Sequence, residues 1–130
     1  MKKISVALLF VLLTVIVGCQ RSQIKEGAVV GKVTMDGSLL PASPPPCIYL
    51  EGDEVTPGGG IARLREDGTY ILPKVRYGTY KVFFKAPPRR FGDPPVVLNI
   101  PEQYRDEKTT DLVVVVDKKR VVFDVNIPAK

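Results

Sequence analysis

The sequence predicts an all-β protein, a single antiparallel β-sandwich of about seven strands that follows a cleaved lipoprotein signal peptide. Short segments alternate apolar and polar residues with a period of two, as half-buried strands do. Turns rich in glycine and proline separate them, since the chain holds 11 Gly and 12 Pro among 130 residues. Beyond the N-terminal apolar run no segment has convincing helical periodicity, and the length suits one domain.

The N-terminal segment has the parts of a bacterial lipoprotein signal. Residues 1–3 are positively charged, and residues 4–17 form an uncharged apolar run of 14 residues. A transmembrane helix needs about 20 residues, whereas a secretory signal needs fewer. Residues 16–19 (Ile-Val-Gly-Cys) resemble a lipobox, so we expect residues 1–18 to be removed and Cys19 to carry diacylglycerol and palmitate-type chains. A buried core helix or an uncleaved anchor is the alternative, and the abrupt polar change at residues 20–23 argues against both.

The anchor predicts an envelope location, either the cell membrane or the outer membrane, with the protein facing the periplasm or the exterior. Residues 19–27 are then the lipidated cysteine and a short polar tether that keeps the domain near the membrane. Without Lys2 and Lys3 the net charge falls from +5 to +3, which does not indicate nucleic-acid binding. The basic run at residues 118–120 is expected to be a solvated turn, with a weak attraction to anionic lipid headgroups as the alternative.

The strongest strand pattern lies at residues 67–86 (DGTYILPKVRYGTYKVFFKA). Gly68 and Gly78 are expected to set turns, and Tyr70 and Tyr80 to fill the core from two strands of a hairpin-like unit. A connection that contains Pro73 is expected between those strands, since proline removes a donor from the backbone ladder. The remaining strands are expected at residues 28–36, 47–51, 61–65, 112–117 and 121–127.

Several elements carry more specific expectations. Residues 61–65 are expected near a sheet edge, whereas residues 112–117 are apolar on both faces and are expected to form a central strand. Residues 100–106 are expected to form a helical turn that begins at Pro101. Cys47 has no partner once Cys19 is lipidated, and its strand-like neighbours predict a buried, inert thiol. A thiol available for an intermolecular disulfide is the alternative.

Three pieces occur in a characteristic order: residues 30–41 (VGKVTMDGSLLP), the DGTYIL…GTYKV element of residues 67–82, and a tail in which residues 100–106 precede two strands. Together they resemble the carboxypeptidase-regulatory-like domains of small secreted bacterial lipoproteins. The departures are a proline insert at residues 44–46 and Leu-Leu-Pro where that family usually has Pro-Leu. The resemblance implies a transthyretin-like (prealbumin-like) sandwich over residues 28–130 that acts as a support, spacer, adhesion or binding module.

The chain contains no histidine, which excludes Ser-His-Asp and Cys-His catalysis and ordinary zinc sites. The histidine-dependent hydrolases and dioxygenases on similar sandwiches are excluded with them. We therefore expect no enzyme activity, no catalytic residue, no cofactor and no metal. Acidic clusters at residues 51–54 and 106–111 are expected to be solvated, and they are the candidates for a carboxylate-based hydrolase or for calcium binding.

The candidate ligand-contact residues are aromatic side chains beside arginines in loops rich in glycine and proline: Tyr77, Arg89, Arg90 and Phe91. The sequence thus predicts a lipid-anchored envelope protein whose sandwich is a structural or binding module for a protein or glycan partner. The alternatives are a subunit of an envelope secretion or transport assembly that presents a β edge, and a carboxylate-based hydrolase.

Overall fold

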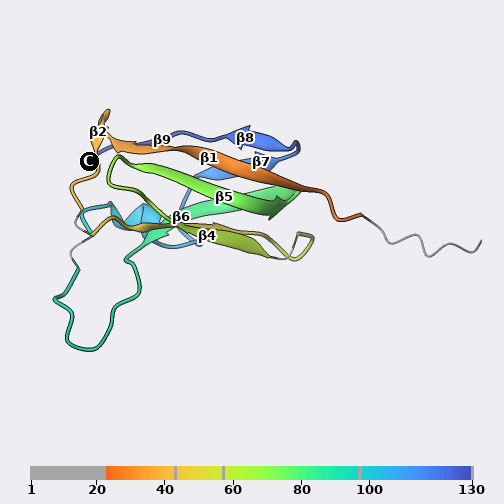
Figure 1. The fold of residues 1–130 in the computed structure, drawn as a ribbon. Helices are drawn as coiled ribbons and strands as arrows, with labels where there is room; N and C mark the ends of the chain where they lie inside the picture. Colours follow the sequence, from red (N-terminus) through yellow and green to blue (C-terminus); the bar gives the residue numbers. More distant parts are fainter. Residues whose placement is uncertain (1–22, 43, 57, 97, 130) are drawn as a thin grey trace, which may run out of the picture.

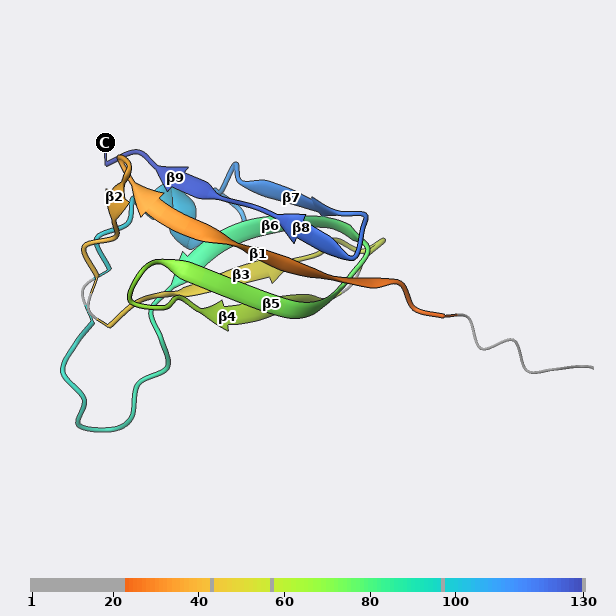
Figure 2. The ribbon, with the colours of Figure 1, turned by 45° about the horizontal axis from the view of Figure 1, so that its top comes forward.

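The computed structural model of the chain describes residues 23–42, 44–56, 58–96 and 98–129. The expected signal peptide at residues 1–18 and the expected lipidation site Cys19 lie outside these residues. The described part folds into nine strands and one 3₁₀ helix, arranged as two sheets packed face to face (Figures 1 and 2). The predicted all-β sandwich is therefore confirmed. Among these same residues, no helix is long and apolar enough to cross a membrane.

The first sheet is built around one long strand. β1 (Glu26–Met35) pairs along one edge with β5 (Thr69–Arg76) and then, after a tight turn, with the short β2 (Ser38–Leu39). Along its other edge it pairs in succession with β8 (Arg120–Val122) and β9 (Val125–Ile127). β1 therefore holds both the middle and the end of the chain in one sheet.

The second sheet is wholly antiparallel, in the order β4 (Gly59–Arg63), β3 (Cys47–Glu51), β6 (Gly78–Lys85) and β7 (Val113–Val116). The 3₁₀ helix η1 (Glu102–Arg105) lies beside β6 and follows Pro101, close to the expected helical turn. β5 and β6 are consecutive but belong to different sheets, so residues 67–86 are not a hairpin within one sheet. They connect the two layers instead.

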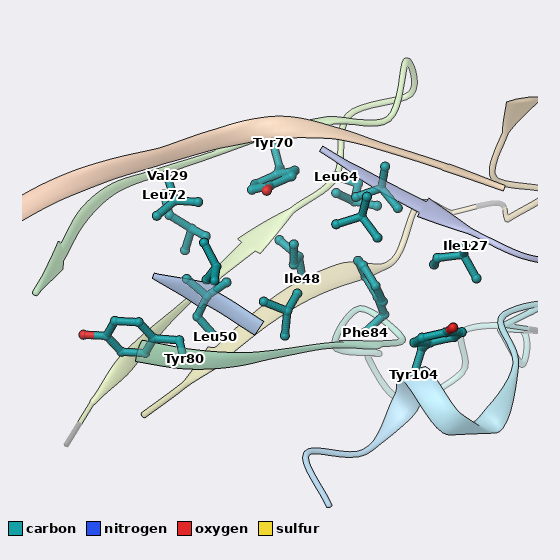
Figure 3. Close-up of a cluster of buried hydrophobic side chains, with 14 of the residues drawn as sticks. Val29, Ile48, Leu50, Leu64, Tyr70, Leu72, Tyr80, Phe84, Tyr104 and Ile127 are labelled. Carbon is teal, nitrogen blue, oxygen red and sulfur yellow. The ribbon is translucent and has the colours of Figure 1, made fainter. Parts of the chain in front are cut away.

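The core lies between the sheets and contains both predicted tyrosines (Figure 3). Tyr70 and Tyr80 are each 1% exposed, which confirms their predicted packing role. Tyr80 donates its hydroxyl to the Arg76 carbonyl oxygen at 2.7 Å and so closes the turn between the layers. Tyr104 of η1 covers one end of the core. The buried side chains that face them include Val29, Val33, Ile48, Leu50, Leu72, Val82, Phe84 and Ile127.

The C-terminal strand differs from the prediction in direction and continuity. β8 and β9 run parallel to β1, and the expected single strand is divided at Phe123 and Asp124. At the division the chain passes close to Gly31, where a Cβ would lie 2.0 Å from the Phe123 carbonyl oxygen. That oxygen accepts a hydrogen bond from the Tyr70 hydroxyl, and the Asp124 carboxylate accepts one from the Lys32 backbone N–H at 2.9 Å. The dividing residues are thus bonded to β1 and β5.

Two further expectations were wrong. Pro73 lies inside β5 rather than in a connection, because the strand bulges there: Leu72 pairs with Val29 but Val75 pairs with Gly27, which leaves one extra residue on β5. A bulge accommodates a residue that cannot donate to the ladder.

β7 is an edge strand rather than a central one, and its outward residues Val113 and Val115 are 49% and 52% exposed. Their β-branched side chains favour strand structure even without burial on both faces.

Candidate functional site

The structure places the four predicted contact residues at opposite ends of the sandwich. Tyr77 lies in the turn between β5 and β6, where its backbone N–H donates to the Lys25 carbonyl oxygen at 3.0 Å. Its half-buried ring packs against the core. Arg89, Arg90 and Phe91 lie in the long loop that follows β6, which projects from the other end (Figures 1 and 2). Tyr77 is therefore separated from the other three.

The long loop ends in a closed turn, which we call the tip turn (residues 89–93). The Asp93 backbone N–H donates to the Arg90 carbonyl oxygen at 3.1 Å, and the Asp93 carboxylate accepts from the Arg90 backbone N–H at 2.7 Å. Arg89 donates from its guanidinium to the Asp93 carbonyl oxygen at 2.5 Å. Gly92 has φ +92°, the left-handed value that such a turn requires at this position. Asp93 thus holds both arms of the turn.

Phe91 stands at the apex of this turn with its side chain fully exposed. Burying a phenylalanine side chain contributes about 1.5–3 kcal/mol, so leaving one in water favours contact with another surface. Prolines on both sides stiffen the loop, since each fixes a backbone dihedral (residues 87, 88, 94 and 95). The tip turn therefore presents one aromatic ring and two arginines in a largely preformed arrangement.

A second cluster, the aromatic face, lies on the outer side of the second sheet. Ile61, Tyr49 and Phe83 occupy one row across β4, β3 and β6. The rings of Tyr49 and Phe83 stack with centroids 5.3 Å apart, and Lys85 places its Nζ within 5.5 Å of both rings. A cation over aromatic rings is attracted to their electron-rich faces. Phe83 is only 2% exposed and Tyr49 is half-buried, whereas Ile61 at the edge of the sheet is 62% exposed.

Next to the aromatic face, the fold joins one residue from each predicted acidic cluster. Glu51 ends β3 and Glu107 follows η1, and both line a shallow pocket with Lys81 and Val113. Desolvation, together with a hydrogen bond and repulsion from the Glu107 carboxyl, raises the pKa of Glu51, while Lys85 opposes the change. Sequence spacing did not reveal this pair, because the two residues are brought together only by the pairing of β3, β6 and β7.

The carboxyl pair is open to water. Glu51 is exposed and Glu107 is half-buried. In retaining and inverting glycosidases the general acid is a carboxyl group whose pKa is raised by its surroundings, such as an apolar pocket. Within the described part of the chain, no group of three or more Cys, Asp or Glu side chains is arranged to hold a metal ion.

Cys47 is 4% exposed on β3. Burial raises the pKa of its thiol, and the nearby Arg63 guanidinium only partly offsets this effect. A thiol must lose its proton to act as a nucleophile, so this environment disfavours reaction. The buried position predicted from its strand-like neighbours is confirmed.

No protein-family model and no curated protein matches the chain. The solved structures that resemble it include two of DUF3823 family proteins. The protein from Bacteroides ovatus is 19% identical with a TM-score of 0.50, and the match covers 79% of this chain and 44% of that one. The protein from Parabacteroides merdae is 21% identical with a TM-score of 0.45, over 82% of this chain and 46% of the other.

The chain spans less than half the length of either DUF3823 protein. The likeness to the Bacteroides ovatus protein supports the β-sandwich fold and nothing more specific.

Proposed function

We propose that the protein is a non-enzymatic lipoprotein of the bacterial cell envelope, anchored through Cys19 in the cell membrane or the outer membrane. Its sandwich, of the carboxypeptidase-regulatory-like or transthyretin-like kind, serves as a binding module. The tip turn is the element that contacts a protein or glycan partner in the periplasm or at the exterior. The single observation that carries this proposal is the fully exposed Phe91 at the apex of a braced turn.

The positions of the two ends support the proposal. The segment that leads from residue 23 into β1 leaves one end of the sandwich, and the tip turn projects from the other (Figures 1 and 2). An anchor at Cys19, seven residues before Glu26, would therefore attach the domain at the end opposite the tip turn and leave that turn accessible. A braced turn also loses little conformational entropy on binding, which favours affinity.

The tip turn is tested by binding of the purified lipoprotein, in mild detergent, to peptidoglycan sacculi, envelope glycans and envelope proteins. Phe91→Ala is compared with Val55→Ala, a matched control whose side chain is 88% exposed in the loop between β3 and β4. Removing a central aromatic contact costs about ten-fold or more in affinity, whereas an exposed side chain outside the contact costs almost nothing. Equal binding by both variants and the unchanged protein would remove the tip turn from the proposal.

The anchor is tested separately in cells with a fatty-acid probe and with globomycin, which blocks removal of lipoprotein signals. We expect the probe to label the protein at Cys19, and globomycin to leave a longer precursor. Cys19→Ser should abolish labelling. A Cys19→Ser protein that still acquires the probe and partitions into membranes through lipid would contradict the anchor.

The edge strand β7 favours a second candidate, a subunit of an envelope secretion or transport assembly. Among the strands that the structure describes, β7 pairs only with β6, and its outward Val113 and Val115 are about half exposed. An open edge with apolar side chains is a template for strand addition by a partner. Val115→Lys should then prevent co-purification of a stoichiometric partner while Phe91→Ala leaves it intact. Loss of the partner with Phe91→Ala but not with Val115→Lys would favour the tip turn as the contact.

A further inference from the structure

The end of the first sheet nearest the tether carries a concentration of positive charge. Three segments that are far apart in sequence meet there: the approach to β1, the end of β5 and the turn before β8 (Figure 1). They contribute six exposed basic side chains and two exposed acidic ones, Glu26 and Asp117, a net charge of +4. The six define the basic patch: Lys25, Lys74, Arg76, Lys118, Lys119 and Arg120.

Backbone contacts hold the three segments in register. The Ala28 N–H donates to the Lys119 carbonyl oxygen at 2.8 Å, and the Tyr77 N–H donates to the Lys25 carbonyl oxygen at 3.0 Å. At Gly27 a Cβ would lie 2.1 Å from the Lys118 carbonyl oxygen, so the missing side chain allows the turn to lie directly against β1. The basic patch is therefore a fixed feature of the fold rather than a set of independent loops.

At this same end of the sandwich, the surface over the second sheet carries acidic side chains. The loop between β3 and β4 carries the exposed Asp53 and Glu54, and it lies against the turn between β5 and β6, because a Cβ at Gly78 would be 2.2 Å from the Thr56 side chain. Glu51 and Glu107 belong to this side as well, and the exposed Lys81 in the same pocket offsets only part of their negative charge. An anionic surface would attract the first sheet and repel the second, which selects one orientation.

The outer face of the first sheet adds apolar side chains beside the basic patch. Ile71 of β5 and Val122 of β8 are 46% and 64% exposed, and both pair with Val30 of β1, so the three form one row across adjacent strands. Ile24, in the segment before β1, is 59% exposed. Apolar side chains next to basic ones are typical of surfaces that lie at a membrane interface.

We propose that the basic patch and the outer face of the first sheet rest on a bilayer that contains anionic lipid, with the acidic side of the sandwich turned away. This docking rests on the proposed anchor. The six residues between Cys19 and Glu26 span at most about 25 Å, so the patch stays near the headgroups. Attraction to such a surface fades within about 8 Å at physiological ionic strength, and tethering supplies the high local concentration that a weak attraction needs.

The test uses the full lipidated protein reconstituted in vesicles of phosphatidylcholine alone, or of phosphatidylcholine mixed with phosphatidylglycerol. Cysteine is introduced as Val122→Cys, on the docking face, or as Val115→Cys, a matched control on the outer face of the second sheet. Labelling by a membrane-impermeant maleimide is timed in both vesicle types. Cys47 is buried and serves as the shared background.

Docking predicts that anionic lipid slows labelling of Val122→Cys about five-fold or more and leaves Val115→Cys unchanged, with the effect lost in high salt. Adding Lys118→Glu and Lys119→Glu should bring the ratio of the two rates back to one. Flotation with neutral vesicles shows that the protein is anchored. If the anchored protein is then labelled equally fast in both vesicle types, or if anionic lipid protects both positions equally, the docking is overturned. A protein that does not float with neutral vesicles overturns the anchor, and the docking with it.

Discussion

Replacing Tyr70 by phenylalanine removes one hydroxyl from the point where the C-terminal segment joins the first sheet. That hydroxyl donates to the Phe123 carbonyl oxygen, which lies against Gly31. The variant keeps the ring and its packing but leaves this partly buried carbonyl without its donor. An unsatisfied buried polar group costs about 1–3 kcal/mol. For a domain of this size the midpoint of thermal unfolding should fall by roughly 5–20 °C.

The Tyr70 hydroxyl also makes the effect depend on pH. Burial, helped by the Asp124 carboxylate, raises the pKa of Tyr70 far above its ordinary value, so the folded protein keeps the proton that the unfolded chain releases above pH about 10. The contribution of Tyr70 to stability is therefore complete below pH 10 and declines as pH rises further. The difference in unfolding free energy between the unchanged protein and Tyr70→Phe should shrink by up to about 1.4 kcal/mol per pH unit in that range.

The assay is urea unfolding followed by circular dichroism at pH 7 and across the alkaline range. Tyr104→Phe is the matched control, because Tyr104 is 8% exposed and its hydroxyl makes no hydrogen bond with another described residue. We expect a small change for the control. Equal stability of Tyr70→Phe and the unchanged protein at pH 7 would refute the role assigned to this hydrogen bond.

Three further predictions concern other positions. Gly31→Ala should destabilise the fold by more than about 3 kcal/mol in the same assay, because its Cβ has no room beside Phe123, and a mild effect would contradict that contact. The Cys47 thiol should react with a thiol reagent only as fast as the protein opens, since it is buried and its pKa is raised, and fast reaction in the folded state would disprove this. Glu51→Gln should raise the unfolding free energy at pH 7 but not at pH 3, because the raised pKa of Glu51 means that folding disfavours the charged carboxylate. Equal effects at both pH values would contradict the pairing with Glu107.

Local patterns in the sequence predicted the strands and much of the core. Alternation in residues 28–36 and 67–86 placed Val29, Val33, Tyr70 and Tyr80 inside, because side chains two apart along a strand share a face. The edge position of β4 was also predicted from its mixed polarity. These features depend on short segments and their immediate neighbours.

Features that depend on distant segments were missed. Nothing in residues 121–127 indicates parallel pairing with β1 or a division at Phe123, since both involve contacts with β1 and β5, which are distant in sequence. The assignment of β5 and β6 to different sheets depends on the whole fold. The pairing of Glu51 with Glu107 and the assembly of the basic patch require strands from remote parts of the chain. None of these contacts can be predicted from the spacing of residues along the sequence.

The accessibility of the tip turn and the docking of the first sheet both depend on the lipid anchor at Cys19. The most direct measurement is the mass of the N-terminal tryptic peptide of the protein purified from membranes. We predict a peptide of residues 19–21 that carries a diacylglycerol group on the Cys19 sulfur. An N-terminal peptide that begins before Cys19, or an unmodified Cys19, would contradict it.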